Sequence, residues 1–461
     1  MKNWLPLKAT LVILVFGAII LLPQAIPSMN YYAFDPRNAN AVLDFKPPTP
    51  MADFDVSPLA SESSLDELRN RRLTAFAPRS LMDPGHTLDH FYESLEKGGV
   101  TRVLHYGDSP TTADLITADV RVLMQQQFGN AGTGFVLIAR PWAWYGRRGV
   151  EMSASNWQID IGGNSPVKDG INGLGAVSFR GAAGAVANWT LADATHHSVE
   201  VYFLSEPEGG DFTMEADGRP MGSASAQAAG TAPAFERFNI PEGCSHVTLR
   251  VTRGSVRLFG ADFRRADPGV VYTSAGINGA NVTLLSRALN EEHWTQELQH
   301  YNPDLVVINY GTNESGFPTF VDTTWGREMR LAVQRVHNAV PNASILLMSP
   351  MDRGAKKDTG EIDTLATLPR LVTTEAKVAL DMNVAFFNTF EAMGGQGTMA
   401  RWYASEPRLV GADYIHPLPA GAKIVGELLF SALHEGYQHH KAQGQRQKIA
   451  DSSATAQARR P

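Results

Sequence analysis

The sequence has a single cysteine, Cys244, among its 461 residues, so no internal disulfide can form. We expect this cysteine to be a small buried hydrophobic residue. Basic residues are also in deficit, because 47 acidic side chains face 40 basic ones and the formal net charge is −7. This balance argues against a nucleic-acid-binding surface as the main function. The pair His196-His197 lacks any ligand-like companion, so we expect no metal site, and no organic cofactor is expected either.

Long apolar runs are missing except at the start of the chain. Residues 9–22, ATLVILVFGAIILL, have lysines before them and match the apolar part of a signal peptide, although they are short for a membrane span. No small-residue cleavage site follows closely, so residues 1–26 are predicted to be an uncleaved anchor in the inner membrane. Anchor and cleaved signal both imply export, and an exported chain without disulfides fits a bacterial periplasm.

Two different patterns of hydrophobic and polar residues predict the fold. Short buried strands alternate with amphipathic helical patterns over residues 101–128 and again from about residue 270, which is typical of a parallel sheet covered on both faces. The segment between them is Gly-rich, with alternating runs such as SVEVYFL and SHVTLRV, and predicts an inserted β-sandwich. The expected fold class is a flavodoxin-like three-layer α/β/α domain interrupted by this sandwich. The expected segments are the signal or anchor (1–26), a Pro-rich tether (27–84), a first α/β segment (85–146), the β-rich insert (147–267), a second α/β segment (268–437) and a disordered tail (438–461).

Polar residues follow four of these predicted segments at points where the chain turns. The blocks are GDS at 107–109, GINGA at 276–280, GTNE at 311–314 and DYIHP at 413–417. Reactive groups in open α/β sheets gather at the carboxyl edge of the strands. We therefore expect the four blocks to meet at one edge of the sheet.

The residue types in these blocks are those that ester hydrolysis needs. Ser109 supplies a hydroxyl nucleophile, His416 a base to take its proton, and Asp413 a carboxylate to orient that base. The backbone N–H groups of Ser109 and Gly279 and the side-chain amide of Asn313 can bind the developing oxyanion. Ser109 taken alone is better explained as an ordinary turn residue, whereas Ser109 together with the other blocks favours catalysis.

The corner around the serine differs from the α/β-hydrolase elbow, because no G-x-S-x-G occurs. Pro110 lacks an N–H and has a fixed φ, so it is predicted at the first position of a helix, with an extended Ser109 before it. Asp108 is open to two interpretations. It either holds the turn together through local N–H groups or takes part in catalysis.

The four blocks together resemble those of the SGNH (GDSL) hydrolase family. The resemblance places the family's hallmark residues on Ser109, Gly279, Asn313 and His416, with Asp413 as the acid, and labels segments 85–146 and 268–437 as the two halves of a hydrolase domain. Glu314 stands where the family commonly has Asp, and Pro110 where it often has Leu or His. The layout, an export signal and a β-rich insert before GINGA, is similar to periplasmic peptidoglycan O-acetylesterases of this group, in which the insert resembles a carbohydrate-binding module.

The resemblance implies an exported serine esterase that acts on an acetylated polysaccharide, with peptidoglycan favoured. An O-acetyltransferase and a non-catalytic glycan-binding protein remain the alternatives. Tentative substrate contacts are Trp142, Trp144 and Tyr145, which either stack on sugar rings or belong to the core. Arg147 and Arg148 either face an acidic glycan or are solvated.

Overall fold

The computed structural model describes residues 80–163 and 167–458. The predicted anchor (1–26) and most of the predicted tether lie outside the described residues. Within those two ranges, no helix combines the length and the hydropathy that crossing a membrane requires.

A six-stranded sheet forms the centre of the α/β region, in the order β1-β17-β14-β13-β2-β12. All neighbours pair in parallel except β1, which runs antiparallel to β17 at the edge. In chain order the five parallel strands follow the sequence 2-1-3-4-5, which is the flavodoxin-like arrangement. The strands are β1 (Leu81–Met82), β2 (Val100–Gly107), β12 (Gly269–Gly276), β13 (Leu305–Asn309), β14 (Ser344–Met348) and β17 (Ala385–Phe387).

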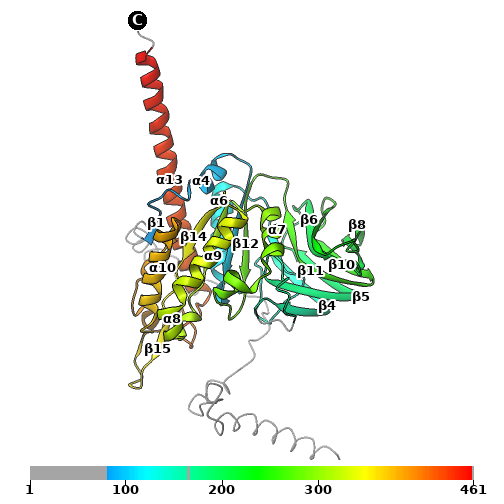
Figure 1. Cartoon of the computed structure of the whole chain (residues 1–461), viewed down its shortest axis with the longest axis horizontal. Coiled ribbons are helices and arrows are strands. Elements are labelled where there is room, and N and C mark those ends of the chain that lie inside the picture. The colour runs from blue at the N-terminus through cyan, green and yellow to red at the C-terminus, as the bar shows by residue number, and fades with distance from the viewer. Residues whose placement is uncertain (1–79, 164–166, 459–461) are drawn as a thin grey trace, which may run out of the picture. The chain divides into compact units, whose positions relative to one another are not determined.

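Helices cover both faces of this sheet (Figure 1). Successive strand residues point to opposite faces, so Val103 joins one apolar core and Leu104 the other. The same alternation separates Val307 from Val306, and the predicted mixed α/β fold is confirmed. One face carries α4 (Asp89–Glu96), α6 (Leu115–Phe128) and α13 (Pro419–Ala458), and the other α7 (Glu291–Tyr301), α9 (Trp325–Ala339) and α10 (Leu368–Met382).

Short elements complete this region. They are α5 (Ser109–Thr112), the π-helical turn η3 (Leu284–Ala288), the 3-10 turn η4 (Glu314–Gly316), α8 (Pro318–Thr323), the hairpin of β15 (Gly354–Lys356) and β16 (Ile362–Thr364), α11 (Thr389–Ala392) and α12 (Thr398–Tyr403). Most of them lie in connections that follow strands, where loops carry function.

The β-rich region forms a nine-stranded antiparallel sheet in the order β8-β7-β10-β5-β11-β6-β9, with β3 beside β11 and β4 beside β5. β3 belongs to this sheet although the sequence assigned its residues to the first α/β segment, because a three-residue strand is too short to show an alternating pattern. The strands are β3 (Gly134–Val136), β4 (Val150–Ile161), β5 (Val177–Leu191), β6 (Ser198–Ser205), β7 (Asp211–Ala216), β8 (Arg219–Ser225), β9 (Ala232–Asn239), β10 (His246–Arg253) and β11 (Ser255–Arg264).

The two ends of this nine-stranded sheet face each other across an apolar core. The ring of Phe212 on β7 lies 5.4 Å from that of Phe203 on β6 and 6.3 Å from that of Phe238 on β9. These strands are far apart in the sheet order, so the sheet folds back on itself. Cys244 is buried, as expected from the sequence.

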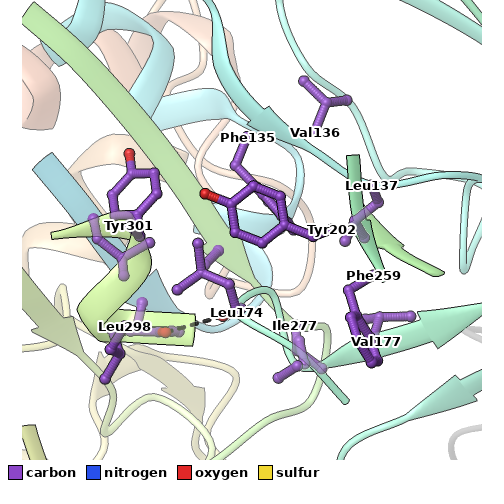
Figure 2. Close-up of a cluster of buried hydrophobic side chains, with 14 of the residues drawn as sticks. Phe135, Val136, Leu137, Leu174, Val177, Tyr202, Phe259, Ile277, Leu298 and Tyr301 are labelled. Carbon is purple, nitrogen blue, oxygen red and sulfur yellow. Dashed lines mark hydrogen bonds between the residues drawn. The ribbon is translucent and has the colours of Figure 1, made fainter. Parts of the chain in front are cut away.

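The same apolar core also joins the nine-stranded sheet to the α/β region (Figure 2). Phe135 and Tyr202 come from the β-rich strands, whereas Leu298 and Tyr301 lie on α7. The rings of Phe135 and Tyr202 meet edge to face with their centres 5.2 Å apart. The two regions therefore share one continuous core on this side of the six-stranded sheet.

Two further predicted boundaries, at the ends of the folded region, were also wrong. The tether does not extend to residue 84, because Leu81 and Met82 pair with Phe387 and Phe386 as the edge strand β1. The expected disordered tail is also incorrect up to Ala458, because α13 continues through it as one helix. The tail sequence is polar and lacks apolar periodicity, but its Ala, Gln, Lys and Arg residues have high intrinsic helix propensity.

Candidate active site

The central strands of the sheet end at the same level. Gly107 at the end of β2 is in register with Gly276 of β12 on one side and with Asn309 of β13 on the other. The strand order reverses at β2, and ligands in open α/β sheets bind in the crevice at such a reversal. Ser109 therefore follows the strand at which the fold itself predicts a site.

Two glycines allow the serine helix to lie directly on these strand ends. A Cβ on Gly107 would lie 2.2 Å from Oγ1 of Thr111, and one on Gly276 would lie 2.2 Å from the backbone nitrogen of Thr112. Both separations are far below van der Waals contact. The helix α5 begins at Ser109, with Pro110 in its first turn, so it starts one residue earlier than the sequence predicted.

Ser109, His416 and Asp413 form a continuous hydrogen-bonded chain. Oγ of Ser109 lies 2.8 Å from Nε2 of His416, and Nδ1 of His416 lies 2.6 Å from Oδ2 of Asp413. Oδ1 of Asp413 accepts from the backbone N–H groups of Ile415 and His416 at 3.0 and 3.1 Å, which fixes the carboxylate. The arrangement has the order nucleophile, base and orienting acid that activates a serine hydroxyl.

The pKa shifts of His416 and Asp413 favour proton transfer from Ser109 to His416. The hydrogen bond to Asp413 raises the pKa of His416 above the usual 6.5, with a further increase from the charge of Asp108 and an opposing effect of burial. Burial alone would raise the pKa of Asp413, but the hydrogen bonds from His416 and the backbone lower it to about 2. Asp413 therefore stays ionised and can stabilise a protonated imidazole.

The expected oxyanion donors come from the two neighbouring strand ends. Gly279 has φ +70°, and a Cβ built there would have no atom within 4 Å, so its backbone is open to an approaching group. The Asn313 amide donates from Nδ2 to the backbone oxygen of Ala280 at 2.8 Å, which directs it towards the Gly279 loop. Its NH₂ group carries a second N–H for another acceptor.

Glu314 ties these two loops together. Its Oε1 accepts from the N–H of Val282 at 2.7 Å and its Oε2 from the N–H of Gly311 at 3.1 Å. Burial raises the pKa of Glu314 to about 8, against the effect of these hydrogen bonds. Glu314, one of the two positions at which this sequence departs from the resembled family, thus connects the Gly279 loop to the Asn313 loop.

Asp108 is buried between the serine and the third block. Burial raises its pKa to about 6, against a hydrogen bond from Thr312 and the nearby charge of His416. Its Oδ2 has no hydrogen-bond partner within the residues that the structure describes. The negative charge of Asp108 raises the pKa of His416, and a part for Asp108 in catalysis stays a prediction.

A pocket of about 520 Å³ opens beside Gly279 and Asn313, the expected oxyanion donors. Its wall includes Arg353 and the aromatic residues Phe317 and Phe320, all three of which the sequence analysis missed. Arg353 follows β14, one of the predicted buried strands, so the rule that functional groups gather at strand ends applied to it as well. The remaining lining residues are Gly279, Asn281, Asn313, Glu314 and Gly316.

The three aromatic residues proposed as substrate contacts have different environments. Tyr145 is buried, and its hydroxyl accepts from the backbone N–H of Leu137 at 3.2 Å, so it belongs to the core. Trp142 is partly buried against the same core. Trp144 is 52% exposed, and its sugar-stacking role stays a prediction.

The two neighbouring arginines differ in exposure, because the Arg147 side chain is buried whereas that of Arg148 is 49% exposed. The Arg147 side chain is buried, donates to the backbone oxygens of Thr133 and Tyr272, and lies 3.5 Å from Asp114. It therefore neither faces a glycan nor is solvated, and both interpretations of it were wrong. Arg148 pairs with Asp119 at 2.5 Å. In residues 80–163 and 167–458, no group of three or more His, Cys, Asp or Glu side chains is placed to hold a metal ion.

Comparisons with known proteins agree with this fold. The model of the GDSL-like lipase/acylhydrolase family matches residues 240–424, which include the second to fourth blocks. No curated protein sequence matches the chain. Among solved structures, one titled "Peptidoglycan O-acetylesterase in action, 5 min" superposes with a TM-score of 0.65 at 22% identity, covering 78% of this chain and 99% of that one. This similarity shows a shared fold.

More distant structures include a protein from Bacillus subtilis, with a TM-score of 0.31, 14% identity, and coverage of 64% of this chain and 90% of that one. A family two carbohydrate esterase from Clostridium thermocellum in complex with cellohexaose has a TM-score of 0.26 and 17% identity, and the match covers 61% of this chain and 100% of that one. TM-scores this low carry no weight here. The fold, with a serine, histidine and aspartate at its carboxyl edge, defines an ester hydrolase of the SGNH type. Residues 240–424 of the chain are similar to the GDSL-like lipase/acylhydrolase family.

Proposed function

We propose that this protein is an exported serine esterase that removes O-acetyl groups from a cell-wall or extracellular polysaccharide, with peptidoglycan as the favoured substrate. The observation that carries the proposal is the Ser109–His416–Asp413 chain, with contacts of 2.8 and 2.6 Å. The pocket next to it is open and has an exposed aromatic side chain, Phe317, which suits a sugar ring better than a long acyl chain.

The reaction proceeds through an acetyl-enzyme. Oγ of Ser109 attacks the acetyl carbonyl carbon while its proton moves to Nε2 of His416. The oxyanion is held by the backbone N–H groups of Ser109 and Gly279 and by the amide of Asn313. Collapse of this intermediate releases the sugar hydroxyl, which takes the proton from His416. Water then gives a proton to His416 as its oxygen attacks the acetyl carbonyl carbon. Collapse of this second intermediate breaks the bond to Oγ of Ser109, which takes the proton back from His416, and releases acetic acid, which ionises to acetate.

Two alternatives differ in what happens to the acetyl group. An O-acetyltransferase would pass it from Ser109 to a second sugar hydroxyl, and a glycan-binding protein would leave the ester intact. The test incubates the protein with O-acetylated peptidoglycan, with and without an unacetylated glycan acceptor, and measures acetate. Free acetate in both reactions supports the esterase. Acetate that falls as acetylated acceptor appears supports transfer, and no change in either reaction overturns both enzymatic functions.

Location and the role of the β-rich region complete the proposal. We propose that residues 1–26 direct export and anchor the body to the inner membrane on its periplasmic side, and that residues 147–267 form an inserted β-sandwich that binds glycan. The apolar run 9–22 and the back-folded sheet support these two proposals. Mass spectrometry of the protein from cells tests the anchor, since an N-terminus beyond residue 22 would mean that the segment is a cleaved signal.

A further inference from the structure

The pocket beside the oxyanion donors carries a cation that hydrolysis of a simple acetyl ester does not need. Arg353 lines this pocket together with Gly279 and Asn313, so its guanidinium lies next to where the ester must bind. It is also electrostatically coupled to His416, Asp108 and Asp413, which places it close to the triad.

The guanidinium is held in place through one end only. Nη1 of Arg353 donates to the backbone oxygen of Thr312 at 2.6 Å and to Oγ of Ser315 at 3.2 Å. Within the residues that the structure describes, no carboxylate lies within ion-pair distance of Arg353. A guanidinium has five N–H donors in a planar fork, so the anchored group keeps donors for a ligand.

The cation is partly desolvated, which strengthens its interaction with an anion. Burial lowers the pKa of Arg353, while the negative charges of Asp108 and Asp413 oppose that shift, and an arginine remains charged under any physiological condition. The loop beneath it also leaves room, because Gly316 has no side chain and a Cβ there would lie 3.2 Å from Nη1.

The other walls of the pocket fit a sugar. Phe317 is 49% exposed, an unusual degree for a large apolar side chain, and Phe320 lies partly buried beside it in the lining. Aromatic faces stack on the apolar faces of sugar rings, and the amide of Asn281 adds a hydrogen-bonding group. A carboxylate attached to that ring would meet Arg353.

We propose that Arg353 selects acidic glycans, by pairing with a carboxylate on the sugar that carries the acetyl ester or on its direct neighbour. This inference rests on the proposed esterase function and narrows its substrate class. A sugar carboxylate has two sources with the same chemistry, a uronic acid or a lactyl ether on a muramic-type sugar. Neutral acetylated glycans, such as acetylated xylan, are expected to be poor substrates.

The experiment compares kcat/KM for acetate release from four substrates: acetylated polyuronate, peptide-free acetylated peptidoglycan with a free lactyl carboxylate, the same polyuronate with its carboxylates amidated, and acetylated xylan. We expect at least one acidic substrate to exceed the neutral ones by about 10–100-fold, as for a charge-assisted pair. Whichever acidic substrate is preferred identifies the source of the carboxylate.

Variants then assign the preference to one side chain. Arg353→Gln should reduce the acidic-to-neutral ratio of kcat/KM to near one, mainly through KM, and Arg353→Lys should restore it in part. Arg330→Gln is the matched control, because Arg330 pairs with Asp381 on exposed surfaces of α9 and α10 and should leave the ratio unchanged.

The outcomes separate this inference from the proposed function. If neither the polyuronate nor the peptide-free peptidoglycan exceeds the amidated polyuronate and the xylan in kcat/KM with the unmodified enzyme, the carboxylate preference is overturned while the esterase function is left intact. A preference that survives in Arg353→Gln overturns the role of Arg353. Acetate release that is absent from all four substrates, and from a small acetyl ester, would instead overturn the proposed function itself.

Discussion

Nε2 of His416 lies 2.8 Å from Oγ of Ser109, although 307 positions separate the two residues in the sequence. The serine follows the central strand β2, and the histidine lies just before helix α13, which packs on one face of the same sheet. The contact therefore depends on the fold as a whole and does not arise from any local motif.

The first prediction concerns this contact. Ser109→Ala, His416→Ala and the double variant should each lose several orders of magnitude in kcat on a simple acetyl ester, and to a similar extent. Ser109, His416 and Asp413 act as a unit, so the losses in kcat from the single variants should not add in the double variant. Ser205→Ala, in the β-rich region, is the control and should retain activity. Near-normal turnover by Ser109→Ala would remove the nucleophile from the mechanism.

The second prediction concerns the oxyanion. Asn313→Ala should lower kcat by ~10²–10³-fold and change KM much less, because the amide acts on charge that develops only in the transition state. Asn338→Ala removes an exposed amide on α9 that pairs with Gln334, and should have no effect. A change confined to KM would make Asn313 a substrate-positioning group.

The third prediction concerns pH. His416 must be neutral to accept a proton, so kcat/KM should fall as the pH drops through a pKa above 6.5. Asp108→Asn removes a negative charge that raises this pKa, so the acid limb of the profile should move to lower pH. Arg353→Gln removes a positive charge that lowers it, so the limb should move to higher pH.

These two opposite shifts are measured from pH profiles of kcat/KM on one neutral ester. If the acid limb of the profile stays at the same pH in both variants, whatever their rates, neither Asp108 nor Arg353 acts on His416 electrostatically.

The fourth prediction concerns Glu314. Glu314→Ala leaves the buried N–H groups of Val282 and Gly311 without an acceptor, at a cost of about 1–3 kcal/mol for each in the free energy of unfolding. The loops that carry Gly279 and Asn313 should also lose their alignment, so kcat should fall. Urea unfolding and steady-state kinetics on the same protein measure both effects.

Glu361→Ala is the control for this variant, because Glu361 is an exposed partner of Lys357, and such pairs contribute about 0–1 kcal/mol. An unchanged urea midpoint in Glu314→Ala would mean that the carboxyl does not tie the two loops together.

Much of this site could be predicted from sequence because strand ends are conspicuous. The apolar runs before Gly107, Gly276 and Gly311 stop abruptly, and parallel strands bring their carboxyl ends to one edge. Ser109, Gly279 and Asn313 were therefore assigned without coordinates. Their catalytic roles remain predictions until the variants are measured.

Other features depend on side-chain directions that a sequence does not reveal. Arg353 lies on a connection whose path decides whether the guanidinium points into the pocket or into solvent. Arg147 was misjudged for the converse reason, because only the fold brings it to Asp114. Similarly, Leu81 and Met82 form a strand only because β17 offers them an edge.

The most direct test of the account is whether Ser109 carries the acetyl group during turnover. The enzyme is mixed with a small acetyl ester, quenched in acid within one turnover, digested and examined by mass spectrometry, with His416→Ala treated in parallel. The account predicts one acetyl group on the peptide containing Ser109 in the unmodified enzyme and none in the variant. Acetate release with Ser109 unmodified at every quench time, or an acetyl group on another residue, would contradict it.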